Sequence, residues 1–312
     1  MSAAEARVLS IQSSVVHGWV GNRAASLILT DHGMEHDLIN SCQLSTHTGY
    51  PNFGGDMVGL PQLQKLTNAL RQQSLLPTYS HILSGYVGNK DFLTEMGALV
   101  KDWKAKRANG IYLCDPVMGD DSPGWYVPQE LADIYKRQIL PLADILTPNL
   151  FELKVLCGRE AIGTKAEILE ALKELHQKGP AVIVLTSARL DSKPGRIFGF
   201  ASQRTGDGEH RQWEFSVQEL KHQFVGTGDI FSSSFLAWLY KDQGNVETAL
   251  SKTLATIQPI LAKTVDYALE KCRREERAEP NAGDLELRLC QSADLIISPP
   301  LNNQSFTLNR CL

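Results

Sequence analysis

Short apolar runs alternate with longer amphipathic segments through the first 190 residues. The short runs predict strands at 7–13, 36–45, 80–86, 110–117, 143–149 and 181–188. The segments between them carry apolar residues at helical spacing and predict helices at 21–33, 60–73, 91–107, 127–138, 151–158 and 165–179. This alternation indicates βαβ units, and therefore an α/β fold with a mostly parallel sheet and helices on both of its faces.

The pattern changes after residue 195. Two runs, 196–203 and 211–220, predict an antiparallel pair joined by the polar stretch RTGDGEH, and two long helical segments follow to about Leu269. Residues 270–287 are highly charged with mixed signs, so we expect a solvated helix end and linker there, after which an apolar segment packs back. No linker interrupts the first 270 residues. The chain is therefore predicted to form one domain, 1–312, with a charged C-terminal segment from about residue 270.

Composition narrows the class of protein. The 312 residues are 43% hydrophobic, enough for a full core, and the net charge is −4. A mildly acidic chain lacks the basic face that sequence-independent nucleic-acid binding needs. The start, MSAAEARVLSIQ, does not resemble a signal peptide, and no run approaches membrane-spanning length. The six cysteines are spread without a C-x-x-C pair, which favours buried free thiols. We expect a soluble cytoplasmic protein without a nucleic-acid or membrane partner.

Polar residues collect where the predicted strands end. In open α/β sheets, ligands bind beyond the carboxyl ends of the strands. The polar set comprises Gln12, Ser13, the stretch STHTGYPNFGG, Ser84, Gly85, Tyr86, Asp115, Asp120, Asp121, Thr147, Asn149, Glu152, Thr186 and Ser187. Each residue alone is more simply a turn or cap residue. Six consecutive strand ends with hydroxyls or carboxylates predict a ligand site at this edge.

The stretch FVGTGDIFSSSF, residues 224–235, places glycines directly before a predicted buried helix. Amides at such a junction can converge on an anion, and the helix macrodipole should keep Asp229 ionised. A carboxylate beside a phosphate-binding amide cluster can accept a proton from an attacking hydroxyl. The alternative is that Asp229 is an ordinary helix cap, and the motif alone does not decide between the two.

Phosphoryl transfer also needs a divalent metal, for which Asp115, Asp120 and Glu152 are candidate oxygen ligands. The stretch DPVMGDDSPGWYVP suits a loop that folds over a nucleotide, or else is a polar surface loop. His32 and His36 have a metal-ligand spacing, but Gly33 between them favours turn residues. The stretch GWVGN has only part of a dinucleotide fingerprint and gives weak support for a dehydrogenase.

Taken in order, VLSIQS, GWVGNRAA, NSCQLSTHTGY, LSGYVG, CDPVMGD, PLADILTPN, VLTS and FVGTGD resemble the pyridoxal kinases of the ribokinase-like superfamily, from about residue 7 to residue 265. The resemblance implies a three-layer α/β/α sandwich and ATP-dependent phosphorylation of the 5′-hydroxymethyl group of pyridoxal, and of pyridoxine and pyridoxamine. Two alternatives are a hydroxymethylpyrimidine kinase and a catalytically inactive ligand-binding protein on the same fold. Asp229 and the carboxylates argue against the inactive protein, because a sensor need not keep a base.

The resemblance also implies roles for single residues and a homodimer. Asp229 matches the catalytic base, Gly226, Thr227 and Gly228 match the anion hole, and Ser13, Thr48 and Tyr86 match substrate contacts. The nucleotide side matches Asp115, Asn149, Leu150, Phe151, Glu152, Thr186, Ser187 and Thr227. Asp120 and Glu152 match a Mg²⁺ site, and Asp115, Thr147 and Thr186 match a site for K⁺ or Na⁺. Leu44, Trp19 and the lid GDDSPGW depart from the usual pattern, which leaves the substrate preference open.

Overall fold

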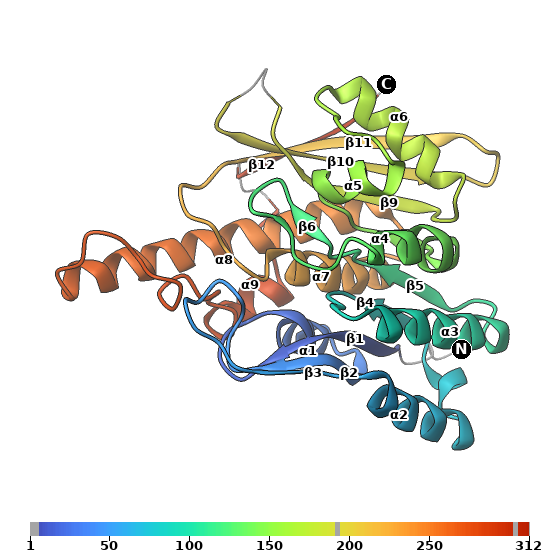
Figure 1. Ribbon diagram of the computed structural model, residues 1–312. Helices are drawn as coiled ribbons and strands as arrows, with labels where there is room; N and C mark the ends of the chain where they lie inside the picture. The colour runs from blue at the N-terminus through green and yellow to red at the C-terminus, as the bar shows by residue number, and fades with distance from the viewer. Residues whose placement is uncertain (1–5, 191–193, 302–304, 312) are drawn as a thin grey trace.

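The computed structural model describes residues 6–190, 194–301 and 305–311. Over these residues one sheet of ten strands runs in the order β12-β11-β10-β9-β8-β5-β4-β1-β2-β3 (Figure 1). Its parallel strands are β1 (Arg7–Val15), β2 (Glu35–Leu44), β4 (His81–Ser84), β5 (Ile111–Cys114), β8 (Ile145–Leu146) and β9 (Val182–Ala188). The antiparallel strands are β3 (Gly55–Met57), β10 (Arg196–Arg204), β11 (His210–Gln218) and β12 (Phe306–Arg310). A separate ribbon pairs β6 (Gly119–Asp120) with β7 (Gly124–Trp125).

Helices cover both faces of the sheet (Figure 1). One face packs on α2 (Leu60–Gln72), α3 (Lys90–Lys106), α4 (Leu131–Ile134), α5 (Leu150–Cys157) and α6 (Lys165–His176). The other packs on α1 (Gly21–Asp31), α7 (Thr227–Lys241), α8 (Val246–Arg274) and α9 (Ala293–Ile297). Neighbouring strand residues point into different cores: Val8 belongs to one and Leu9 to the other, and both are buried. The expected three-layer α/β/α sandwich is confirmed.

The chain reverses direction along the sheet beside β1. From β1 it crosses through α1 to β2 on one side, whereas from β4 it crosses through α3 to β5 on the other. Helices α1 and α3 cover opposite faces, so the crevice between them opens at the carboxyl ends of β1 and β4. Ser13 and Tyr86 therefore lie at the topological switch point. Asp115, Thr147 and Thr186 lie further along the same edge, just after β5, just after β8 and on β9.

Some predicted elements differ from those observed. The predicted helix at 127–138 is regular only over Leu131–Ile134 and continues as a π turn, Tyr135–Ile139, and a 3₁₀ turn, Leu140–Leu142. Pro141 lacks a backbone N–H, so it cannot extend the regular α ladder. Short 3₁₀ turns also form at Leu76–Thr78 and Cys290–Ser292. None of the described helices is both long and apolar enough to span a membrane.

The two histidines at metal-ligand spacing do not form a site. His32 follows the last turn of α1 and is buried against Trp238, whereas His36 lies on β2 beside the hydroxyl of Ser26, 2.7 Å away. The prediction of turn residues therefore holds for His32 and is wrong for His36. All six cysteines are free, but only Cys42, Cys114 and Cys272 are buried, and Cys290 is exposed.

The expectation of a solvated linker in the charged C-terminal segment is wrong for its second half. Helix α8 does extend into the charged stretch and ends at Arg274. Beyond it, however, Asp284 is fully buried and Leu287 nearly so. The reason is charge pairing within the segment, because Asp284 forms ion pairs with Lys271 and Arg277. A carboxylate with two cationic partners can be buried where an unpaired one cannot.

Candidate active site

The loop before α7 is shaped for a close approach of backbone. Gly226 caps the helix in the left-handed conformation, with φ +94°. A Cβ at Gly226 would lie 2.2 Å from the carbonyl oxygen of Trp19, so no larger residue fits without displacement. No side chain caps α7 at this position, which leaves the first-turn amides at Thr227 and Gly228 available to an anion.

Asp229 lies between two helix N-termini. It belongs to the first turn of α7, and its carboxylate accepts the backbone N–H of Gly21, the first residue of α1. We expected the helix dipole to keep this group ionised. The surrounding protein raises the pKa of Asp229 to about 6, because burial outweighs the bond from Gly21. A carboxyl group with this pKa is still mostly ionised at neutral pH and is a stronger proton acceptor than an exposed one.

Ser13 lies next to the same peptide. Gly21 has φ +52°, and a Cβ there would lie 2.1 Å from the carbonyl oxygen of Ser13 and 2.4 Å from its Oγ. Ser13 and Asp229 therefore contact the same residue from two sides, although 216 positions separate them along the chain. Glycine is required at position 21 because both its backbone conformation and its neighbours exclude a side chain.

Tyr86 comes from the neighbouring strand, as the sequence predicted. It follows β4, and the amide of Gly85 continues the pairing with β1 by donating to Ile11, at 3.1 Å. The carbonyl of Tyr86 accepts the hydroxyl of Ser41 at 2.6 Å, which fixes the turn. The tyrosine is half-buried and packs against the hydrophobic core. Tyr86 and Ser13 thus border the crevice at the switch point.

Thr48 is exposed in the loop that follows β2. This loop reaches the loop leading into α7 (Val225–Gly228, here called the anion-binding loop), because a Cβ at Gly49 would lie 3.3 Å from the side chain of Val225. Leu44 ends β2 at the start of the loop and is half-buried. Thr48 therefore belongs to a loop that contacts the residue before Gly226.

A buried carboxylate, Asp115, lies beside Gly228 in the first turn of α7. A Cβ at Gly228 would lie 3.5 Å from Oδ2 of Asp115, which is buried at the end of β5. Burial, together with the charges of Glu152 and Asp229, raises the pKa of Asp115 well above its usual range. A bound cation would relieve this repulsion and restore the charge.

Two threonine hydroxyls lie on the next two strands along the sheet, one just after β8 and one on β9. The amide of Thr147 donates to Cys114 at 3.1 Å, and the buried Oγ1 of Thr147 has no hydrogen-bond partner. The hydroxyl of Thr186 donates to the carbonyl of Pro148 at 3.3 Å. An unpartnered buried hydroxyl and a buried carboxylate form a donor set that fits a hard monovalent cation.

Glu152 has a structural role that the sequence analysis did not consider. Its Oε1 accepts the amide of Met118 and its Oε2 accepts the amide of Asn149, each at 2.9 Å. Asn149 in turn accepts the amide of Glu152, so the pair forms a capping box at the start of α5. Burial outweighs these bonds and raises the pKa of Glu152 to about 8. The spacing N-x-x-E was the signal in the sequence that could have identified this role.

The ribbon β6–β7 is tied to the same helix start. The side-chain amide of Asn149 donates to the carbonyl of Gly119 at 2.7 Å, and Phe151 packs edge-on against Trp125 with ring centroids 5.1 Å apart. Asp120, on β6, is half-buried, and burial raises its pKa. Leu150 opens α5 and is buried, whereas Ser187 on β9 is half-buried. The predicted nucleotide-side residues thus lie on adjoining elements.

Two carboxylates near the start of α5, Asp120 and Glu152, bear on how a metal ion could bind. Across residues 6–190, 194–301 and 305–311, no three His, Cys, Asp or Glu side chains gather into a metal-binding group. Mg²⁺ commonly binds through one or two carboxylates, with water and phosphate oxygens completing its shell. Asp120 and Glu152 fit this kind of site, in which a substrate supplies the remaining ligands.

Known proteins are similar to this chain over most of its length. Residues 85–271 match the family model described as phosphomethylpyrimidine kinase. The pyridoxal kinase of Bos taurus is 39% identical over 313 residues, which cover 97% of this chain and 99% of the relative. The pyridoxal kinase of Homo sapiens is 38% identical with the same coverage. The chain belongs to the pyridoxal kinase family. The solved pyridoxal kinase from Leishmania donovani in complex with ADP and pyridoxine is 28% identical, with a TM-score of 0.86 over 98% of this chain and 99% of that one.

One group of residues in this pyridoxal kinase family member escaped the sequence analysis. His47 and Tyr50 flank Thr48, and both contact Glu286 from the charged C-terminal segment. The stretch STHTGY was recognised as polar, but only Thr48 was selected from it. Nothing local in the sequence indicates Glu286, because its partners lie more than 200 positions away.

Proposed function

We propose that this chain transfers the γ-phosphoryl group of ATP to the 5′-hydroxymethyl group of pyridoxal and of the related vitamers pyridoxine and pyridoxamine. The observation that carries the proposal is the position of Asp229, between the N-termini of α7 and α1 and beside the amides of Gly226–Gly228. A carboxylate there can accept the proton of the attacking hydroxyl while the amides stabilise charge on the phosphoryl group. Membership of the pyridoxal kinase family supports the choice of substrate.

We assign the two sides of the crevice to the two substrates. Ser13, Thr48 and Tyr86 would contact the pyridine ring, because they come from β1, from the loop after β2 and from the turn after β4. The nucleotide side would comprise Asp115, Asn149, Leu150, Phe151, Glu152, Thr186, Ser187 and Thr227. ADP and pyridoxine are bound together in the Leishmania donovani relative, which supports a site for both kinds of ligand.

We further propose that two cations take part. Asp120 and Glu152 would hold Mg²⁺ on the phosphate groups, and Asp115, Thr147 and Thr186 would hold K⁺ or Na⁺. The unpartnered hydroxyl of Thr147 and the raised pKa of Asp115 support a cation at the second site. When bound, these ions supply neutralisation of phosphate charge. Removal of Mg²⁺ with EDTA should abolish activity, and undiminished turnover would contradict the magnesium assignment.

The decisive experiment is a coupled assay of ADP release with a panel of B6 vitamers and pyrimidines. Turnover with pyridoxal, dependent on ATP, supports the proposal. A second candidate is a hydroxymethylpyrimidine kinase, favoured by the description of the matching family model. Turnover with hydroxymethylpyrimidine in preference to every B6 vitamer would establish that candidate. The absence of turnover with binding of pyridoxal intact would indicate a ligand-binding protein without activity.

The assembly and location of the protein complete the proposal. We propose that residues 1–312 act as one domain, since β1 and β12 from opposite ends of the chain belong to one sheet. We also propose a cytoplasmic homodimer, on the basis of the pyridoxal kinase resemblance. The edge strand β3 is exposed along its whole length and offers unpaired backbone groups to a second copy. Light scattering that gives the mass of a monomer at micromolar concentration would contradict the dimer.

A further inference from the structure

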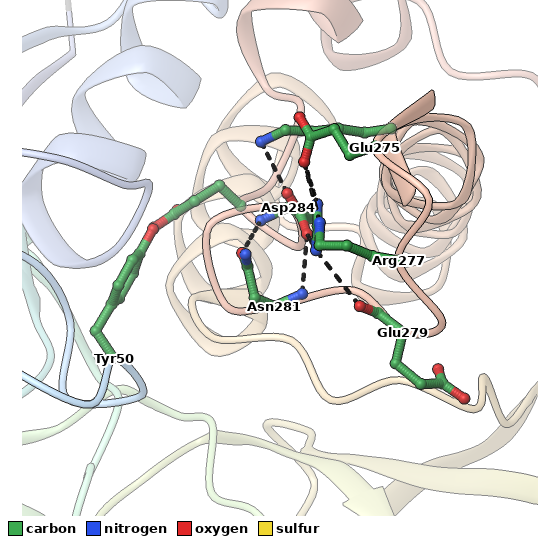
Figure 2. A network of polar contacts seen from close by, with 8 residues as sticks. Tyr50, Glu275, Arg277, Glu279, Asn281 and Asp284 are labelled. Carbon is green, nitrogen blue, oxygen red and sulfur yellow. Dashed lines mark hydrogen bonds and ion pairs between the residues drawn. The ribbon is translucent and has the colours of Figure 1, made fainter. Parts of the chain in front are cut away.

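The charged C-terminal segment is anchored by a buried carboxylate. Asp284 accepts the backbone N–H of Asn281 at 2.9 Å and forms ion pairs with Arg277 at 2.6 Å and with Lys271, on α8, at 2.8 Å. Figure 2 shows Arg277 between Glu275 and Asp284, with the hydroxyl end of Tyr50 pointing toward the segment. Burial alone would raise the pKa of Asp284, but its bonds to Arg277 and Lys271 hold that pKa well below the usual range. The segment is therefore fixed to the end of α8 rather than free in solvent.

Two residues further on, Glu286 accepts three donors from two other parts of the chain. Its Oε2 accepts the backbone N–H of Trp19 at 3.1 Å, and its Oε1 accepts the hydroxyl of Tyr50 at 2.9 Å and lies 3.3 Å from Nε2 of His47. The amide of Gly49 donates to Nδ1 of His47 at 3.1 Å, so the proton available to Glu286 is on Nε2. Burial opposes the charge, but the bonds from His47 and Tyr50 outweigh it and lower the pKa of Glu286.

These donors belong to loops that border the acceptor side of the crevice. Trp19 lies in the turn between β1 and α1, and its carbonyl oxygen meets Gly226. His47 and Tyr50 lie on either side of Thr48 in the loop after β2. A Cβ at Gly226 would also lie 3.3 Å from the side chain of Leu287, the residue after Glu286. One short stretch of chain thus supports the β1–α1 turn, the loop after β2 and the anion-binding loop.

We propose that Glu286 is a positioning residue for the acceptor alcohol. It joins the β1–α1 turn, which follows Ser13, to the loop that holds Thr48, and its neighbour Leu287 lies beside Gly226. This inference rests on the proposed function and adds a residue to its acceptor site. The nucleotide side is built separately, from the capping box of α5 and the end of β9. Within the described residues, the hydrogen bonds of Glu286 reach the first two loops only and do not extend to α5 or β9. Its loss should therefore affect pyridoxal much more than ATP.

The test is Glu286→Gln, with Glu279→Gln as the matched control. Glutamine keeps the shape of the side chain but replaces one acceptor oxygen with an NH₂ group. In either orientation of the amide, this NH₂ group faces a donor, because one oxygen of Glu286 accepts from Trp19 and the other from Tyr50. Glu279 lies in the same segment but is exposed, and its side chain pairs with Lys221. We expect Glu286→Gln to raise the KM for pyridoxal about tenfold, with the KM for ATP within about twofold of wild type. Glu279→Gln should leave both constants unchanged.

The outcomes separate this inference from the proposed function. If wild-type protein turns over pyridoxal and Glu286→Gln behaves like Glu279→Gln, the positioning role is wrong. It is also wrong if the KM values for pyridoxal and ATP rise together, because a general loss of structure would act on both. If wild-type protein does not turn over pyridoxal, the proposed function itself fails.

A milder variant covers the case in which Glu286→Gln does not fold. Tyr50→Phe removes one hydroxyl donor to Glu286 and keeps the ring. It should raise the KM for pyridoxal about threefold without a change for ATP. An unchanged KM for pyridoxal in Tyr50→Phe would overturn the proposal. Thermal denaturation of each variant identifies the one to be used.

Discussion

Replacing Asp229 by asparagine tests the centre of the proposed chemistry. Asparagine keeps the size of the side chain and can still accept the N–H of Gly21, but it cannot take a proton from the acceptor hydroxyl. With a pKa of about 6, the wild-type carboxyl group is ionised in about nine molecules of ten at pH 7, so the base is present before the substitution. The variant therefore removes a group that is already in its active form.

The expected loss follows from the kind of transition state. General base catalysis typically contributes about 10²- to 10⁴-fold. In a loose phosphoryl transition state the hydroxyl loses its proton late, so we expect the lower end, about 100-fold in kcat, or about 2.7 kcal/mol of barrier. Pyridoxal and ATP should still bind, since Ser13, Tyr86 and the nucleotide-side residues are unchanged. Replacing Asp229 should even relieve repulsion on Asp115.

The assay combines ADP release for kcat with calorimetric binding of each substrate. Asp91→Asn is the matched control, because Asp91 is also an acidic residue in the first turn of a helix but is exposed on α3. The control should retain wild-type kcat. A near-normal kcat in Asp229→Asn would reduce Asp229 to a helix-capping residue and remove the main support for the proposed mechanism. A loss of binding equal to the loss of kcat would show that the charge organises the site rather than accepts the proton.

Three further substitutions test separate parts of the structure. In steady-state assays, Ser13→Ala should raise the KM for pyridoxal, because the loss of one hydrogen bond weakens binding by about 0.5–1.5 kcal/mol, and should leave the KM for ATP unchanged. Equal changes in the two KM values would contradict the assignment of Ser13. Gly226→Ala should lower kcat and the melting temperature, because its Cβ would meet a backbone oxygen. The control is Gly244→Ala: Gly244 has φ +85° but open space around it, so this change should lower the free energy of unfolding by only about 1 kcal/mol. Burial and nearby lysines lower the pKa of His32 from 6.5 to about 4. As the pH falls below 6.5, the unfolded chain therefore binds a proton at His32 before the folded protein does, and the free energy of unfolding decreases. Between pH 7 and pH 5, the free energy of unfolding measured in urea should decrease by about 2 kcal/mol less in His32→Phe than in the wild-type protein. A decrease as large as that of the wild-type protein would refute this account.

The sheet could be predicted where strands are buried on both faces. Such strands appear as continuous apolar runs, and 181–188 was predicted almost as Val182–Ala188 is observed. Strand β3 is three residues long and all three residues are exposed, so it has no apolar pattern to find. Strand β12 was missed as well, because its partner β11 lies about 90 positions away and pairing alone defines it.

The chemistry of the site was less predictable than its residues. The motif around Gly226 located Asp229, but the direction of its pKa shift depends on how tightly the whole chain packs around it. The sequence also carried a signal that was not used, since Asn149 and Glu152 have the spacing of a capping box. Both oxygens of Glu152 accept backbone amides, so any metal at Glu152 would have to use its remaining lone pairs.

The two sides of the crevice differ in how far apart their supporting residues lie in the sequence. On the nucleotide side, Asn149 and Glu152 bond to each other across three positions, and such local pairs can be recognised from spacing. On the acceptor side, Glu286 bonds to Tyr50 across 236 positions and to Trp19 across 267. Neither periodicity nor a short motif indicates contacts between residues so far apart in the sequence. The mixed charges around Glu286, considered alone, predict a solvent-exposed segment. The proposed acceptor side therefore depends on long-range contacts with the C-terminal segment, and the sequence separation of those contacts is why spacing along the chain did not reveal them.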